Sequence, residues 1–339
     1  MKCLRAIMTG TAFIASTSVM ATPSLMDCLQ NEHSSTCKYQ MAAALSKDGS
    51  SLTVPKTQAF SLFALKNTIY HGIDGIEASF RLQNGIWVGE PYQPGGSIMP
   101  QVILVPDIIA KGDLTADQQD DAVVMLDFSP GGTGQYLYLA VMENRLGQPI
   151  NIATQFVGDR VRVKDLHIEN GKIIMTAIEP SSTDAMCCPG NVVKRIWQLQ
   201  NHQLVEEKSQ ESVQRLTLNL LDNSGWKLDS WQYGEPVSAN THITLRYQDE
   251  HLVGKTACHS YSIAVRDTLR PGFINLAADY STMDTTECTT EQQDADKRYL
   301  EQLAHVNQFT FFAGRLTLSY NSNGHLGVMI FSPQTSSEN

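Results

Sequence analysis

Hydrophobic and polar positions alternate along much of the chain. In runs such as 122–128 and 136–142, β-branched and aromatic residues recur at the spacing of a β-strand, and turn residues separate the runs. The dipeptide Asn170-Gly171 lies between two further runs, and Asn-Gly favours the two-residue turn of a β-hairpin. The pattern predicts a β-rich N-terminal domain over residues 22–205.

The first residues have the pattern of a secretory signal. Lys2 and Arg5 precede a run of apolar and small residues that ends at Ala21. This predicts a signal peptide over residues 1–21, cleavage near Ala21, and a periplasmic or secreted mature protein. Residues 24–47 have a helical composition, and we expect a short helical piece there, within the N-terminal domain.

A second pattern begins after a polar break. Residues 206–212 are mostly polar or charged, and they predict a linker over 206–223. Strand alternation then returns, and a single helix with apolar residues at helical spacing follows it. We expect Thr290 to cap this helix, whose apolar positions are Ala295, Tyr299, Leu300, Leu303 and Val306. Further strands complete a small barrel-like α+β domain over residues 224–333, with a tail at 334–339. The whole molecule is therefore expected to be mainly β.

Composition and charge exclude several classes of protein. The chain has 339 residues, of which 42% are hydrophobic and 18% charged, and this balance indicates a folded chain. Its 35 acidic and 25 basic side chains give a formal charge of −10, and no run of Lys and Arg occurs, so nucleic acid is not expected as a partner. No apolar run after the signal reaches the roughly 18 to 20 residues of a membrane-spanning helix, so no membrane span is expected.

The cysteines indicate disulfides. One of the seven lies in the predicted signal, which leaves an even number in an exported chain. Disulfides are the usual state of cysteines in an oxidising compartment. The pairs that proximity in sequence suggests are Cys28 with Cys37, Cys258 with Cys288, and Cys187 with Cys188, the last either as a vicinal pair or as two thiols.

The C-terminal part resembles the META domain (HslJ-like) family over residues 223–333. The resemblance rests on Trp226-Lys227-Leu228, Ile243 to Tyr247, the run from Gly254 to Tyr261, the segment from Thr285 to Cys288, and Tyr299-Leu300. His259 stands where the family usually has Asn, and Glu287 stands where it usually has Met or a similar residue. The resemblance implies a bacterial envelope or secreted domain linked to stress or motility, without established catalytic machinery.

The first half is similar to the LppP/LprE lipoprotein-like domain over residues 107–204. The similarity rests on Gly112 to Thr115, Asp120 to Val124, Tyr136 to Val141, Gly158 to Val161, and Cys187-Cys188-Pro189. A lipoprotein has a cysteine for acylation at the end of its apolar signal, and this chain lacks one there. A lipid anchor is therefore not carried over from the resemblance.

The segment from Asp113 to Asp121 has oxygen-bearing side chains at alternate positions. Calcium takes six to eight oxygen ligands from a loop that folds round the ion. The candidate ligands are Asp113, Thr115, Asp117, Gln119 through its backbone carbonyl, and Asp121. The loop is similar to the calcium loops of FG-GAP repeats, except that Gln118 stands where those loops usually have Gly. A turn without metal, in which Asp side chains accept from backbone N–H groups, uses the same residues, and both interpretations stay open.

Other motifs have simple structural explanations. A strand pattern follows Gly131 to Gly134, so a hairpin turn is expected there and not a phosphate loop. Cys258 and Cys288, with His251 and His259 nearby, would suit zinc or a cysteine nucleophile, but a disulfide leaves no thiolate for either. No Gly-x-Ser-x-Gly motif occurs in the chain, which argues against a serine hydrolase of that type.

The sequence predicts an exported, non-catalytic protein that is an envelope-stress or interaction module and binds an envelope or secreted protein. The aromatic candidates to line a groove are Trp87, Tyr92, Trp226, Trp231 and Tyr233. Such residues more often belong to the core, and we expect this of Trp226. An alternative is an inhibitor of a secreted enzyme or a binder of a small apolar ligand inside the barrel. A third is a thiol-redox or hydrolytic enzyme that uses Cys187-Cys188. A barrel cavity would favour the ligand binder, and an exposed apolar patch would favour the partner binder.

Overall fold

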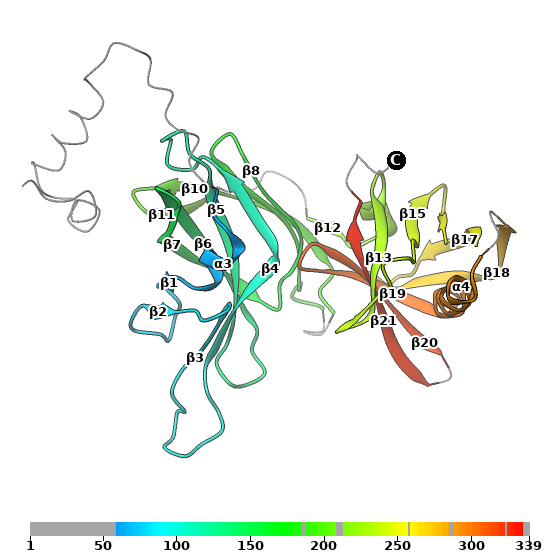
Figure 1. Ribbon diagram of the computed structural model, residues 1–339, viewed down its shortest axis with the longest axis horizontal. Helices are drawn as coiled ribbons and strands as arrows, with labels where there is room; N and C mark the ends of the chain where they lie inside the picture. The colour runs from blue at the N-terminus through cyan, green and yellow to red at the C-terminus, as the bar shows by residue number, and fades with distance from the viewer. Residues whose placement is uncertain are drawn as a thin grey trace, which may run out of the picture. The chain divides into compact units, whose positions relative to one another are not determined.

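Two antiparallel sheets form most of the N-terminal half (Figure 1). The computed structural model describes residues 59–184, 188–207, 213–256, 258–284, 288–322 and 324–334. The first sheet has the strand order β3 (Ile86–Val88), β4 (Gln101–Gly112), β5 (Asp121–Ser129), β6 (Tyr136–Arg145) and β7 (Gln148–Asp159). The second has the order β11 (Gln203–Glu207), β10 (Asn191–Gln200), β9 (Lys172–Glu179) and β8 (Arg162–Glu169), and β12 (Gln214–Arg215) pairs with β10.

Several predictions lie outside the described residues. They are the signal peptide, the helical piece at 24–47, Cys28, Cys37, Cys187 and most of the tail. The predicted hairpin lies inside them and is confirmed. Glu169 pairs with Lys172 across Asn170 and Gly171, whose φ angles are 52° and 72°, as a two-residue turn of this kind requires.

The central strands β5 and β6 are buried on both faces. Val123 packs with Trp197 of the second sheet in one core, whereas its neighbour Val124 packs with Leu82 in another. The second core also includes residues of three short N-terminal elements, α3 (Leu62–Lys66), β1 (Ile69–Tyr70) and β2 (Phe80–Arg81). A strand that is covered on both sides needs apolar residues at successive positions, which explains the unbroken run Ala122 to Leu126.

The C-terminal half is a separate antiparallel sheet that bends into a nearly closed barrel. Its strand order is β18 (Ile274–Asp284), β17 (His259–Asp267), β16 (His251–Lys255), β15 (Thr244–Gln248), β13 (Gly225–Gln232), β21 (His325–Pro333), β20 (Arg315–Ser322) and β19 (Val306–Phe312), and β14 (Glu235–Pro236) pairs with β13. The two ends of this order approach each other, because Phe309 N donates to Gly272 O at 2.8 Å and Phe273 bridges to Gln308.

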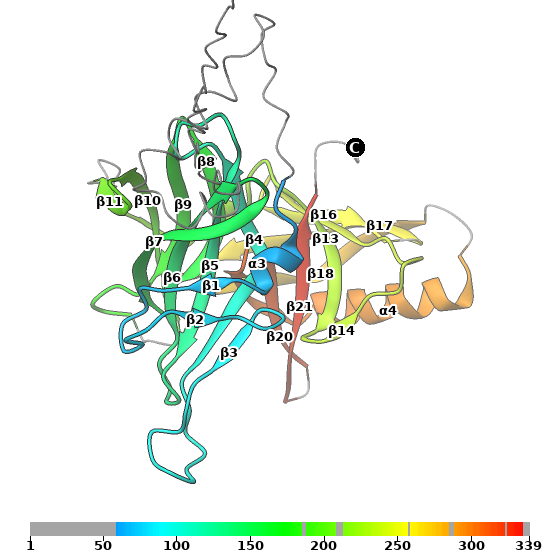
Figure 2. The ribbon, with the colours of Figure 1, turned by 60° about the vertical axis from the view of Figure 1, so that its left-hand side comes forward.

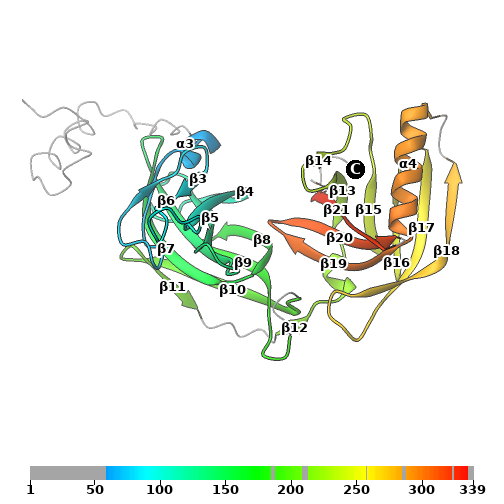
Figure 3. The same ribbon diagram turned by 90° about the horizontal axis from the view of Figure 1, so that it is seen from below.

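Helix α4 (Thr290–Leu303) lies beside β17 in this half (Figure 3). Tyr299, Leu300 and Leu303 belong to the barrel core together with Trp226 and Phe331. Within the helix the predicted apolar face is therefore the buried face, whereas Val306, predicted as part of it, is the first residue of β19. Thr289, and not Thr290, is the N-cap, because its hydroxyl accepts from Gln292 N while the Gln292 side chain accepts from Thr289 N.

The barrel core begins before residue 224. A 3₁₀ turn, Leu218–Leu221, follows β12, and the buried residues Leu216, Leu218 and Leu221 pack with the barrel. The segment predicted as a linker thus contributes apolar residues to the second half. Among the described residues, no helix is long and apolar enough to cross a membrane.

The turn between β19 and β20 contacts strands of the first half. Residues 57–339 form one compact unit. Gly314 N donates to Val163 O at 3.0 Å, and Arg315 pairs with Asp107 at 2.7 Å. Ala313 is buried among the residues of the first-half core that contains Trp197. This turn therefore joins the two halves by packing as well as by chain connection.

Candidate functional site

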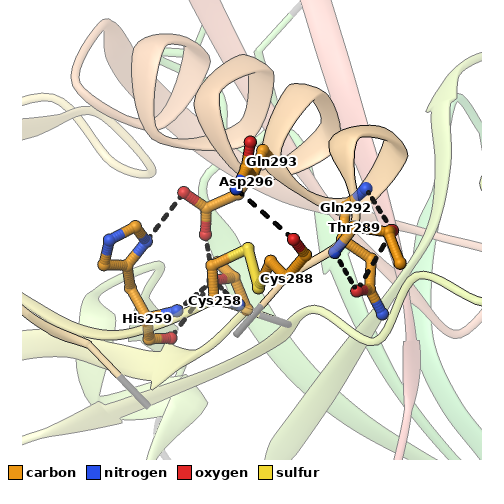
Figure 4. The surroundings of a disulfide bond; sticks show 8 residues. Cys258, His259, Cys288, Thr289, Gln292, Gln293 and Asp296 are labelled. Carbon is orange, nitrogen blue, oxygen red and sulfur yellow. Dashed lines mark hydrogen bonds and ion pairs between the residues drawn. A yellow bond between two sulfur atoms is a disulfide. The ribbon is translucent and has the colours of Figure 1, made fainter. Parts of the chain in front are cut away.

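A disulfide fixes the start of helix α4 to the start of β17 (Figure 4). Cys258 directly precedes β17, and Cys288 directly precedes the helix N-cap. The bond confirms the predicted pair Cys258–Cys288. Because the two sulfur atoms are bonded to each other, neither is a thiolate, so the disulfide form cannot use Cys258 as a nucleophile or as a zinc ligand.

A buried carboxylate lies beside this disulfide. Asp296 of α4 is only 5% exposed, and its carboxylate accepts from the Thr256 hydroxyl and pairs with His259 Nδ1 at 2.9 Å (Figure 4). The Thr256 hydroxyl also accepts from His259 N at 2.9 Å. The three residues therefore tie the strand to the helix. His259, which departs from the usual family pattern, is one of the two groups that hold Asp296.

Two buried tyrosines make a separate polar contact in the core. The hydroxyls of Tyr261 and Tyr299 are 2.6 Å apart, and the Tyr261 hydroxyl donates to Thr244 O at 2.7 Å. Burial raises the pKa of both phenols well above the usual value. Both side chains therefore stay neutral over the physiological pH range and act as structural hydrogen-bond partners.

The loop from Asp113 to Asp121 has the hydrogen bonds of a tight turn. Asp113 accepts from the backbone N–H groups of residues 117 and 118, and Asp117 accepts from Gln119 N. Asp121 is fully buried and accepts from three backbone N–H groups, those of Leu114, Thr115 and Asn144. Burial raises the pKa of Asp121, and these backbone donors oppose that rise.

The same loop keeps two features that suit a cation. Gln119 Oε1 is buried and accepts no hydrogen bond from the residues that the structure describes. Gln118 has a φ of 67°, the conformation that glycine provides in comparable calcium loops. Within the described ranges, however, no three acidic, histidine or cysteine side chains converge as metal ligands. Calcium at Asp113, Thr115, Asp117, Gln119 and Asp121 therefore stays a prediction, and the observed bonds are those of the alternative turn.

The loop that leads to Cys188 is held by an ion pair. Asp184 accepts from the backbone N–H groups of Ser181 and Gly190, and Arg215 donates to both of its carboxylate oxygens. Arg215 is the main cause of a strongly lowered pKa of Asp184. The pairing of Cys187 with Cys188 is not tested, because Cys187 lies outside the described residues.

An apolar surface lies on the hairpin formed by β3 and β4. We name it the hairpin patch, and its exposed members are Ile86, Val88, Tyr92, Ile98, Met99 and Ile103. Figure 2 shows that the β3–β4 connection extends beyond the neighbouring strands. Tyr92 is 60% exposed and Ile98 is 57% exposed. Of the aromatic candidates, Trp87 packs on Phe80 with ring centroids 5.1 Å apart, so Tyr92 is the aromatic residue of the patch.

The barrel interior is occupied by aromatic side chains. Tyr299, Phe309, Phe311 and Phe331 are fully buried, and Trp226 is nearly so. They belong to one continuous core. These side chains fill the space that an apolar ligand would need inside the barrel. The observations therefore favour an exposed patch over a barrel cavity as the binding feature.

The C-terminal half is defined by this nearly closed antiparallel barrel with a single packed helix. Residues 216–331 match the family model of the META domain, so this part of the chain is similar to that family. No curated protein matches the chain. The similarity of residues 107–204 to the LppP/LprE lipoprotein-like domain stays a prediction.

Proposed function

We propose that the protein is an exported, non-catalytic binding protein of the cell envelope, and that the hairpin patch binds a protein partner. The observation that carries the proposal is an apolar surface that is both exposed and ordered. Soluble proteins seldom expose contiguous apolar surface unless it has a partner. The predicted signal peptide and the similarity to the META domain family support a place in the envelope.

The β3–β4 connection is held in shape by its own hydrogen bonds. Gly89 N donates to Pro100 O at 2.8 Å, and Tyr92 N donates to Ile98 O at 3.2 Å. A Cβ atom on Gly131 would overlap the Ile98 side chain and would lie tightly against the Met99 backbone. A surface that is already ordered loses little conformational entropy when it binds. The patch is therefore suited to specific recognition.

The charge around the hairpin patch favours another protein as its binding partner, over a membrane or a second copy of the chain. Residues 86–103 contain no Lys or Arg, and their single charged side chain is Glu90. Attachment to an anionic membrane usually needs basic residues beside the apolar ones. Two copies of a chain with a net charge of −10 repel each other. We therefore assign the patch to a protein partner with an apolar groove and basic surroundings.

The buried carboxylates support a role without catalysis. Asp121 accepts hydrogen bonds from three backbone N–H groups. Asp184 accepts from the Arg215 guanidinium, and Asp296 interacts with Thr256 and His259. Carboxylates that are engaged in this way fix strands, loops and a helix in place.

The test compares two doubly substituted chains with the unchanged protein. In the hairpin variant, Ile98→Ser and Met99→Ser remove apolar surface from the patch. In the control, Leu269→Ser and Leu326→Ser make the same kind of change at two highly exposed positions of the other half. We expect an envelope protein captured by cross-linking to bind the unchanged chain and the control, and its Kd for the hairpin variant to be at least about tenfold higher.

Three outcomes would contradict the proposal, provided that all chains have similar melting temperatures. Equal capture by the hairpin variant and the control would remove the patch from the interaction. Concentration-dependent dimers that the hairpin variant abolishes would assign the patch to a second copy. Flotation with lipid vesicles that the hairpin variant abolishes would assign it to a membrane.

A further inference from the structure

The backbone pairing between β15 and β16 stops before the ends of the two strands, and hydrogen bonds to side-chain hydroxyls take its place there. Backbone pairing extends only from Arg246 with Val253 to Gln248 with His251. Beyond it, Lys255 N donates to the Thr244 hydroxyl at 3.0 Å, and Thr244 O accepts from the buried Tyr261 hydroxyl. The two strands therefore separate at Thr244 and Lys255.

Glycine is required at the point of separation. A Cβ atom on Gly254 would overlap the Thr244 carbonyl oxygen and the Tyr261 hydroxyl. With no side chain there, the Tyr261 hydroxyl reaches Thr244 O from below the sheet, and a groove of about 680 Å³ opens on the outer face. The groove is thus fixed by Gly254 and by the tyrosine beneath it.

Two cationic side chains line the groove in this acidic protein. Its lining residues are Thr244, Arg246, Val253, Gly254, Lys255, Ser260, Tyr261 and Gln334. None of these lining residues is acidic among the residues that the structure describes. Hydroxyl and amide groups add hydrogen-bonding capacity, and Val253 and Tyr261 add carbon surface. An anionic group that is attached to an apolar chain matches both features.

Strand register shows how charge and apolar surface are arranged. Lys227 pairs with Thr244, and on the other side of the opening Lys255 pairs with Ser260, which in turn pairs with Met283. Residues directly opposite each other on neighbouring strands share one face of a sheet. This row is therefore cationic at Lys227 and Lys255 and apolar at Met283, whose side chain is 74% exposed.

We propose that this groove binds a single-chain anionic amphiphile. The head group lies between Arg246 and Lys255, and the Lys255 ammonium donates charge-assisted hydrogen bonds to its carboxylate or phosphate. The chain lies over Val253 and Ser260 toward Met283, and its burial removes carbon surface from water. The site is separate from the hairpin patch and does not depend on the function proposed for it.

Calorimetric titration of the full-length protein below the critical micelle concentration of each ligand tests the proposal. Dodecanoate has the carboxylate head group of a fatty acid, and dodecyl phosphate has the phosphate of a phospholipid, so the two probes distinguish these natural ligands. Dodecyl maltoside tests whether charge is needed, and inorganic phosphate tests whether the chain is needed. We expect at least one of the two anionic amphiphiles to bind, with affinity that falls as salt is added, and we expect the maltoside and inorganic phosphate to bind at least about tenfold more weakly.

Charge-neutral variants locate the site. Arg246→Gln and Lys255→Gln should each weaken binding about tenfold, the usual effect of losing a charge-assisted hydrogen bond. The matched controls are Arg266→Gln, at the far end of β17, and Lys297→Gln, on the exposed side of α4, and both should bind as the unchanged protein does. Equal weakening in the controls, equal binding of the maltoside, or no binding of either anionic amphiphile would overturn the proposal.

Discussion

At the scale of single residues, Asp184 and Arg215 make a pH-dependent contribution to stability. The pKa of Asp184 is lowered in the folded protein, chiefly by its hydrogen bonds with Arg215. A carboxylate with a lowered folded pKa stabilises the fold above its unfolded pKa of about 3.9, and this contribution is lost as pH falls toward the folded pKa. We expect Arg215→Gln to lower the free energy of unfolding by about 1 kcal/mol at neutral pH.

Urea unfolding at two pH values tests this prediction. The difference between Arg215→Gln and the unchanged protein should shrink as the buffer is acidified below the unfolded pKa of Asp184. Lys297→Gln serves as a control, because its weak pair with Glu301 spans 3.9 Å on an exposed helix face. A difference that is the same in neutral and acidic buffer would show that Arg215 does not act through the charge of Asp184.

Contacts between residues far apart in sequence cannot be predicted from local patterns. Asp296 pairs with His259 across 37 positions of sequence, a separation that local patterns do not span. The sequence nevertheless indicated that Asp296 would be buried, because it follows Ala295 and lies one turn before Tyr299, on the apolar face of the helix. A carboxylate on such a face needs a partner when it is buried. The pattern therefore indicated that a partner exists without identifying it.

At the scale of elements, the Cys258–Cys288 bond closes a chain segment that includes β17 and β18. The sequence separation is 30 residues. Loop-closure entropy for a segment of this length gives a stabilisation of about 3.5 to 4 kcal/mol. We expect the double variant Cys258→Ala with Cys288→Ala to lose free energy of unfolding of about this size in chemical denaturation. A loss well below about 1 kcal/mol would show that the hydrogen bonds of Asp296 suffice to hold the helix.

The loop from Asp113 to Asp121 gives a second prediction at this scale. If calcium completes the loop, an excess of calcium over chelator should raise the melting temperature, because a ligand that binds only the folded state stabilises it. Asp117→Asn should remove the increase, since it replaces a candidate carboxylate ligand in an exposed part of the loop. A melting temperature that is unaffected by calcium would assign the loop to the hydrogen-bonded turn.

Most strands were predictable because their alternation or apolar runs are local properties. The turn at Asn170-Gly171 and the helix face from Ala295 to Leu303 follow from nearest neighbours in sequence. The hairpin patch could not be predicted from the sequence. Residues 86–103 have the pattern of a partly apolar strand pair, and only the structure shows which of its faces is exposed. The groove over Gly254 depends on Tyr261 reaching Thr244, which only the register of three strands establishes.

At the scale of the whole molecule, the two proposed surfaces belong to different cores. The hairpin patch adjoins the core that contains Phe80 and Val102, whereas the groove lies over the core that contains Leu245 and Tyr261. These two cores have no residue in common among those described. Distant sites without shared partners usually contribute independently, within about 0.3 to 0.5 kcal/mol.

Independence of the two surfaces is therefore the prediction for the intact chain. Ile98→Ser with Met99→Ser should leave the affinity for the anionic amphiphile within about twofold of the unchanged value. Arg246→Gln should leave the affinity for the captured protein partner equally unaffected. Coupling is reciprocal, so a saturating amphiphile that changes partner affinity must itself bind more tightly or more weakly in the presence of the partner. Such a reciprocal change would contradict independence of the two surfaces.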